Sequence, residues 1–150
     1  MALDWLKTNL SAARNSVAQE VAKFKNRSFL EATIAGVVVV AYADGLITPD
    51  EKQKMMGFVQ RHEALKVFDT SQIIDLFKKY AENYDFDRSI GESQALEAVG
   101  KIKKNESEAR LLVRVCCVIG AADGNFDDDE KAAVRRICDE LGLNPSEFDL

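Results

Sequence analysis

Two apolar stretches, "ATIAGVVVVAYA" (residues 32–43) and "LLVRVCCVIGAA" (residues 111–122), decide the fold that this chain is expected to adopt. Each is hydrophobic nearly all round when it is drawn as a helix, and such a helix has to be covered on every side. The β-branched run from Val37 to Val40 also suits a strand, but the length of the stretch and its likeness to the second one favour a helix. The two stretches therefore predict a central pair of buried helices.

The rest of the chain has the pattern of amphipathic helices that would surround this pair. Apolar residues recur at spacings of three and four, as in Ile73, Phe77 and Tyr84, and no alternating strand pattern of useful length is present. Both prolines, Pro49 and Pro145, stand where helices should begin. We predict an all-α, single-domain bundle over residues 1–150, with about seven to eight helices, at residues 3–24, 29–43, 49–60, 71–84, 87–104, 106–122, 128–141 and 145–149.

The composition restricts the classes of function. The net charge is −5, so nucleic acid is not an expected partner. No apolar run approaches the roughly 20 residues that a membrane span needs, and the N-terminus lacks a secretory signal, so a cytoplasmic location is predicted. The cysteines, Cys116, Cys117 and Cys138, lack metal-knuckle spacing and are expected to be small core residues. A soft-metal or oxyanion-reducing thiol pair is the alternative.

Residues 1–27 predict a basic amphipathic helix. Basic side chains outnumber acidic ones there, and an apolar stripe follows one face, formed by Trp5, Leu6, Leu10, Val17, Val21 and Phe24. The stripe favours packing on the bundle. The alternatives are docking on an anionic membrane surface, which basic amphipathic helices can bind, docking on a partner helix, or a mobile arm.

One acidic phrase occurs twice. "AYADGLITPDEKQKM" (residues 41–55) and "GAADGNFDDDEKAAV" (residues 120–134) match at an offset of 79 residues (123 − 44). A buried helix is expected before each phrase and an amphipathic helix after it. We therefore predict two pseudo-repeated halves, at about residues 29–60 and 106–141, around the central buried pair.

Helix capping accounts for part of each phrase. Thr48 with Glu51, and Asp127 with Glu130, have the spacing of a capping box, and a glycine after each Ala-Asp suits a left-handed helix end. Capping does not explain why an aspartate stands just past a helix C-terminus, where negative charge is disfavoured, or why four acids follow one another from Asp127. Crowded carboxylates favour a hard divalent cation. The spacing does not fit an EF-hand loop.

The chain resembles the tellurite-resistance TerB family of bacteria almost from end to end. The segments that carry the resemblance are "EKQKMMGFVQ" (51–60), "LKVFDTSQII" (65–74), "YDFDRSIG" (84–91), "ADGNFDDDEKAAVR" (122–135) and "LGLNPSEFDL" (141–150). The last two are the most specific, because a short Ala-Asp-Gly phrase alone occurs in many helical proteins.

This resemblance implies an all-α bundle with two pseudo-repeated halves, encoded among tellurite-resistance and stress-response genes. It implies a cytoplasmic protein that chelates metal and works with the membrane protein TerC, and with other resistance-system proteins, near the inner membrane. Carried over by position, the implied ligands are Asp44, Asp50, Glu51, Asp123, Asp127, Asp129 and Glu130, with Asp85 and Asp87 as weaker additions. The first copy has Leu46 and Thr48 where the second has Asn125 and Asp127, so its site is expected to bind more weakly.

Three functions are consistent with the sequence. The first is a metal-binding interaction module in which Ca²⁺ is the expected ion. The second is a metal-independent acidic scaffold that docks partners or an anionic membrane surface through residues 1–27. The third is an enzyme, which we do not expect, because no nucleophile elbow, phosphate-binding glycine loop or zinc motif is present. The one histidine, His62, lies in the polar segment "QRHEAL" and is expected to be solvated.

Overall fold

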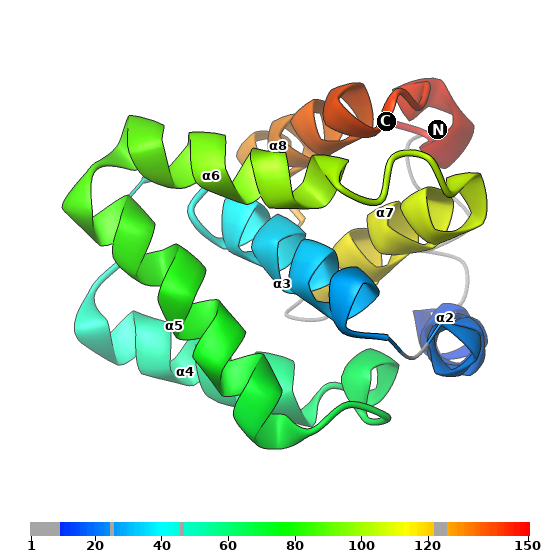
Figure 1. The fold of residues 1–150 in the computed structure, drawn as a ribbon, viewed down its shortest axis with the longest axis horizontal. Coiled ribbons are helices and arrows are strands. Elements are labelled where there is room, and N and C mark those ends of the chain that lie inside the picture. The colour runs from blue at the N-terminus through cyan, green and yellow to red at the C-terminus, as the bar shows by residue number, and fades with distance from the viewer. Residues whose placement is uncertain (1–9, 25, 46, 122–125) are drawn as a thin grey trace.

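The protein folds into a bundle of helices (Figure 1). The computed structural model describes residues 10–24, 26–45, 47–121 and 126–150. Its elements are α2 (Leu10–Lys23), α3 (Arg27–Ala41), α4 (Pro49–Arg61), the 3₁₀ turn η1 (Glu63–Leu65), α5 (Thr70–Phe86), α6 (Arg88–Gly100), α7 (Glu106–Ala121), α8 (Asp128–Leu141) and the 3₁₀ turn η2 (Pro145–Phe148). No strand occurs in these residues, and the predicted all-α class is confirmed.

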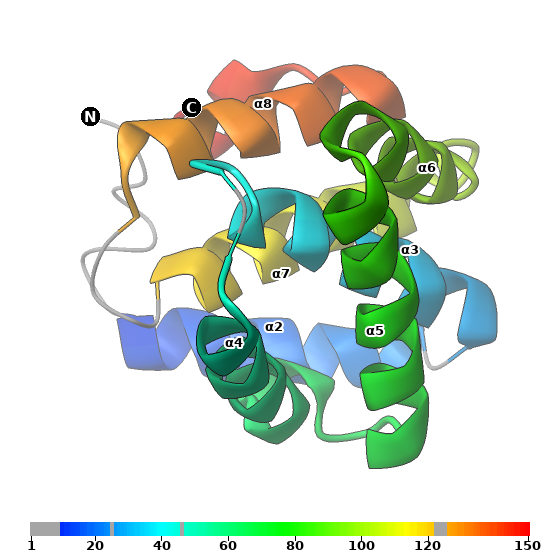
Figure 2. The same cartoon turned by 90° about the vertical axis from the view of Figure 1, so that its left-hand side faces the viewer.

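The two apolar stretches form the buried centre, as predicted. Every residue from Phe29 to Val40 is buried except Glu31, and α7 is buried over its middle except at two arginines. The helices α3 and α7 pack against each other, and the other helices surround them (Figures 1 and 2). The Val37–Val40 run is helical because burial of four valines outweighs a helix-propensity cost of roughly 0.5 kcal/mol per residue.

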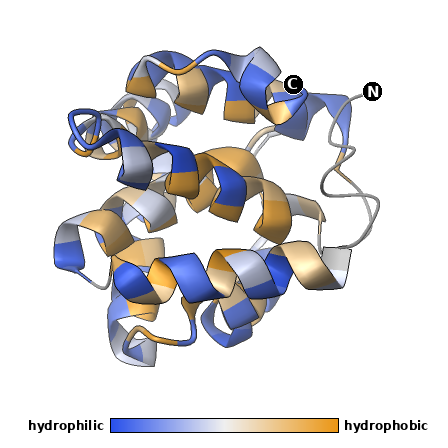
Figure 3. Ribbon diagram, turned by 90° about the vertical axis from the view of Figure 1, so that its right-hand side faces the viewer, coloured by the Kyte–Doolittle hydropathy of each residue, from blue (hydrophilic) through white to orange (hydrophobic). Residues whose placement is uncertain are grey.

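The surrounding helices bury one face each. Figure 3 shows hydrophobic residues gathered toward the inside of the bundle and hydrophilic ones toward the outside. Val17 and Val21 of the apolar stripe lie in the core, Phe24 is half-buried, and α2 packs against α7 and η1. An ion pair between Glu20 and Arg114 also joins α2 to α7. This part of the N-terminal helix therefore packs on the bundle; residues 1–9 lie outside the described part of the chain.

Several helix ends differ from the predicted ones for local reasons. The helix α5 begins at Thr70, and Asp69 is its N-cap, accepting a hydrogen bond from the Ser71 amide at 2.9 Å. The helix α6 ends at Gly100 rather than residue 104, because the chain turns there before α7. Asn105 then accepts from the Glu108 amide at 3.1 Å and fixes the start of α7.

The two predicted halves share helix order but differ in packing. The helix α8 lies against α3, α6 and α7, whereas α4 lies mainly against α5 and η1. The pseudo-repeat therefore stays a prediction. In the described residues, no helix is both long enough and apolar enough to cross a membrane.

Candidate functional site

The first acidic phrase joins α3 to α4 through a turn that is closed by a capping box. The α3 helix ends at Ala41, and Gly45 has a φ of +132°, which a residue with a side chain rarely adopts. The Glu51 amide donates to Thr48 Oγ1 at 3.2 Å, and the Thr48 amide donates to Glu51 Oε1 at 3.1 Å. These hydrogen bonds lower the pKa of Glu51, and the predicted capping box is confirmed.

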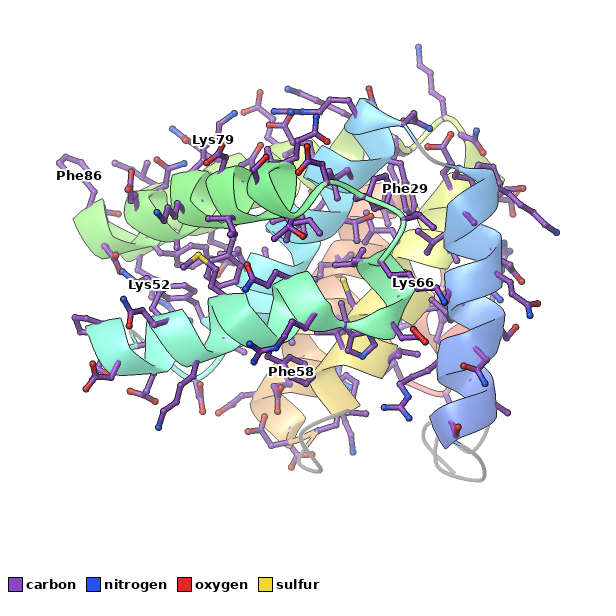
Figure 4. The ribbon with its side chains drawn as sticks, turned by 90° about the horizontal axis from the view of Figure 1, so that it is seen from below. Phe29, Lys52, Phe58, Lys66, Lys79 and Phe86 are labelled. Carbon is purple, nitrogen blue, oxygen red and sulfur yellow. The ribbon has the colours of Figure 1, made fainter. Side chains whose placement is uncertain are left out.

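The segment "YDFDRS" holds this first turn from a distant part of the sequence. Arg88 donates to the carbonyl oxygen of Tyr42 at 2.9 Å and to that of Ala43 at 3.3 Å, which satisfies carbonyl groups beyond the end of α3. Asp85 forms an ion pair with Lys52 and accepts from the Tyr42 hydroxyl at 3.3 Å. Figure 4 shows Lys52 on the side of α4 that faces α5. Sequence analysis did not predict these roles for Lys52 and Arg88.

Packing beneath the turn fixes the position of the same segment. The rings of Tyr42 and Tyr84 stack with centroids 4.5 Å apart. Burial, together with the nearby Asp85 carboxylate, raises the pKa of Tyr42 above its usual value. Asp87 is the N-cap of α6, with Oδ1 accepting from the Ile90 amide at 3.0 Å. Asp85 and Asp87 thus have structural partners in the protein itself.

The second acidic phrase begins α8 with a capping box of the same kind. Asp127 Oδ1 accepts from the Glu130 amide at 2.8 Å, and Glu130 Oε1 accepts from the Asp127 amide at 3.1 Å. Asp127 and Glu130 are half-buried, while Asp128 and Asp129 are exposed in the first turn. This capping box is also confirmed. Asp123 and Gly124, which the sequence predicts to precede it, lie outside the described residues.

The structure leaves the predicted ligand set untested. Asp44 and Asp50 are exposed at the first phrase, and Asp129 is exposed at the second. Their side chains have no hydrogen-bond or ion-pair partner in the described part of the chain. Among residues 10–24, 26–45, 47–121 and 126–150, no three His, Cys, Asp or Glu side chains are grouped closely enough to hold an ion. Asp123 is not part of that comparison.

An apolar groove, which the sequence did not indicate, lies between α3, α4 and α7. It has a volume of about 250 Å³, and its walls include Val37, Met55 and Phe58, with Lys54 and Glu130 as its charged residues. Glu130 therefore belongs both to the second phrase and to this groove. The only sequence signal for the groove is the apolar stripe of α4, which is only half-buried at Met55 and Phe58.

The thiols and the histidine occupy buried positions. Burial raises the pKa of all three cysteines, that of Cys138 to about 12, so they behave as the core residues that the sequence predicts. His62 is only 6% exposed, and the expectation that it is solvated was wrong. The reason is local: α4 ends at Arg61, the chain turns, and the imidazole folds back to accept from the Ala64 amide at 3.1 Å.

Comparisons with known proteins agree with these features. The sequence model of the family described as "Tellurite resistance protein TerB" matches residues 30–150, a range that includes both acidic phrases. A curated relative from an Alcaligenes species, "Tellurium resistance protein TerB", is 35% identical over 112 residues, which cover 75% of this chain and 92% of the relative. No solved structure matches the chain. With the helical bundle and both capped acidic phrases inside the matched range, the chain belongs to the TerB family of tellurite resistance proteins.

Proposed function

We propose that this protein is a metal-binding interaction module of the tellurite-resistance system that chelates a divalent cation through its two acidic phrases. The names of the family and of the relative refer to tellurite and tellurium resistance. Ca²⁺ is the first candidate, because it accepts carboxylate and carbonyl oxygens in a flexible geometry. The ligands in this proposal remain Asp44, Asp50, Glu51, Asp123, Asp127, Asp129 and Glu130.

The observation that carries the proposal is the excess of negative charge at the start of α8. The capping box uses one oxygen each of Asp127 and Glu130. Asp128 and Asp129 add two exposed carboxylates without a partner in the described residues. The helix dipole favours each acid by up to about 1 kcal/mol, but neighbouring carboxylates repel one another. A bound cation would offset this repulsion, so the second phrase is the stronger site in the proposal.

A second surface supports the interaction part of the proposal. Phe86 is 82% exposed and Ile90 is 43% exposed at the corner between α5 and α6. Their neighbours Asp85 and Arg88 contact the first acidic turn. Exposed aromatic residues are frequent anchors of protein interfaces. We propose that this corner and the adjacent turn dock a partner in the cytoplasm, and the family resemblance makes a TerC-like protein of the inner membrane, with other resistance-system proteins, the first candidate.

The cation is tested by titrating Ca²⁺, Mg²⁺, Mn²⁺ and Zn²⁺ into the protein and following amide NMR shifts. An open carboxylate site should bind Ca²⁺ with a Kd of roughly 10⁻⁴–10⁻³ M, and tenfold that concentration should raise the free energy of unfolding by about 1.4 kcal/mol. Asp129→Asn should weaken binding, while Asp75→Asn, which removes an exposed acid from α5, should not. Equal effects of the two variants, or no shifts near residues 44–51 and 126–131 at millimolar ion, would refute chelation.

The alternative is a scaffold that needs no ion, and the two confirmed capping boxes favour it, because they give structural roles to much of each phrase. In the described part of residues 1–27, membrane docking would use the basic face of α2, since Val17 and Val21 are buried. Partner capture in EDTA separates the two functions. The metal-dependent module should lose its partner in EDTA, whereas the scaffold should keep it and lose it in Phe86→Ser, with Lys78→Ser on the same helix as control.

A further inference from the structure

We propose that a cleft between α2, the end of α4 and η1 binds a small oxyanion. The cleft has a volume of about 380 Å³, and its walls are Arg14, Asn15, Phe58, Arg61, His62 and Glu63. It lies at the opposite end of α4 from the first acidic phrase. Figure 4 shows α4 running toward α2, with Phe58 labelled on α4 and Lys66 near the junction. The inference does not depend on the proposed cation site.

His62 carries a donor in the wall of this cleft that has no acceptor among the described residues. Its Nδ1 accepts from the Ala64 amide at 3.1 Å, so the proton of the neutral ring is on Nε2. Nε2 is buried and has no hydrogen-bond partner within the described part of the chain. The Phe58 ring stands edge-on to the imidazole, with centroids 5.5 Å apart and planes at 69°, and offers no lone pair. An unsatisfied buried donor destabilises the folded protein, and an incoming acceptor would relieve this cost.

Two guanidinium groups give the cleft its positive charge. Neither Arg14 nor Arg61 forms a hydrogen bond or ion pair with the described residues of the chain. The one acid in the wall, Glu63, pairs with Lys66 at 3.5 Å. Four other arginines of the bundle are engaged: Arg88 with backbone carbonyls, and Arg110, Arg114 and Arg136 with glutamates.

These groups select an anion with several oxygen acceptors. Guanidinium groups donate in a fork that matches oxyanions, and the neutral imidazole donates a further N–H. Burial and the Arg14 charge lower the pKa of His62 to about 4, so the ring stays a neutral donor at pH 7. Nε2 has no exposed surface, so the ligand reaches it only when a side chain of the wall rotates. The shared chemistry is an inorganic oxyanion, such as phosphate or tellurite, or the phosphate of a lipid headgroup.

The test uses the single histidine of the chain as its reporter. Phosphate and, separately, tellurite are titrated against the His62 imidazole resonances at pH 7, with potassium chloride matching the ionic strength. Saturable shifts are expected, and Arg14→Gln and Arg61→Gln should each weaken binding about tenfold, the loss of one charge-assisted hydrogen bond. His62→Asn, followed by amide shifts, keeps an acceptor for the Ala64 amide and should also weaken binding.

Arg135→Gln is the matched control, because Arg135 is exposed on α8 and loses the same charge. Its affinity for the oxyanion should equal that of the unchanged protein. Flotation with phosphatidylglycerol vesicles distinguishes the source of the phosphate. If the protein binds the vesicles, both Arg14→Gln and Arg61→Gln abolish this binding, and free anions do not shift the His62 resonances, then the cleft binds a lipid headgroup. Absence of both kinds of binding, or an equal loss in Arg135→Gln, overturns the proposal.

Discussion

Lowering the pH should destabilise this protein through one identifiable side chain, His62. Burial, and secondarily the Arg14 charge, lower the pKa of this imidazole from 6.5 to about 4. As the pH falls below 6.5, the unfolded chain binds a proton that the folded chain does not yet accept. The stability that His62 contributes is therefore complete above pH 6.5 and is lost as the pH falls toward 4. Linkage with these two pKa values gives a loss of about 2 kcal/mol by pH 5 and about 3 kcal/mol by pH 4.

The variant His62→Asn isolates this contribution. The asparagine oxygen can replace Nδ1 as the acceptor of the Ala64 amide, but the amide does not titrate. The variant also loses the packing of the imidazole ring against Phe58, and this lowers the free energy of unfolding by an amount that does not depend on pH. Urea unfolding followed by circular dichroism at pH 7, 6 and 5 should therefore show that the unchanged protein loses about 2 kcal/mol more than the variant between pH 7 and 5.

Direct titration of the His62 imidazole can refute this prediction. Because the chain has one histidine, its imidazole NMR signals need no assignment. A titration midpoint of the imidazole near pH 6.5, or equal losses of stability in the two proteins, would mean that the ring is solvated. The buried position of His62 would then be wrong. Arg14→Gln should raise the midpoint, because it removes a positive charge that opposes protonation.

Three further predictions concern packing, caps and thiols. Gly91→Ala should cost at least about 2 kcal/mol in urea unfolding, because an added Cβ would lie 2.5 Å from the Tyr84 backbone; Gly120→Ala, with no neighbour nearer than 3.6 Å, should be neutral or stabilising. Thr48→Ala and Asp127→Ala, measured in calcium-free buffer, should each lose about 1 kcal/mol by removing a capping box; no change in either would contradict the capping geometry. All cysteines should resist a thiol reagent in the folded protein and react in urea, since burial raises their pKa; rapid reaction of the folded protein would disprove this.

Much of the fold followed from local sequence rules. The central pair of buried helices could be predicted because a helix without a polar face has to be covered on every side. Both capping boxes could be predicted because each depends on a short spacing in the chain. His62 was misjudged because its burial depends on how the chain turns after Arg61 and on α2 packing nearby, and neither is visible in the flanking polar residues.

Only those contacts of the candidate site that join residues close together in the sequence could be predicted. The acids at the start of α8 were expected from the sequence, but the ion pair of Lys52 with Asp85 joins residues 33 positions apart. Likewise, the cleft brings Arg14 of α2 to Arg61 and His62 at the end of α4, and no single segment contains a signal for it. Tertiary packing brings such groups together, and a spacing rule cannot report it.

The first acidic turn is anchored from a distant part of the chain, and this couples it mechanically to the corner between α5 and α6. Arg88 spans 46 and 45 positions to hold two carbonyls of the first turn. That turn therefore moves only with the α5–α6 corner, unless two hydrogen bonds break. Strain applied at the exposed Phe86 corner would thus be transmitted to the first turn.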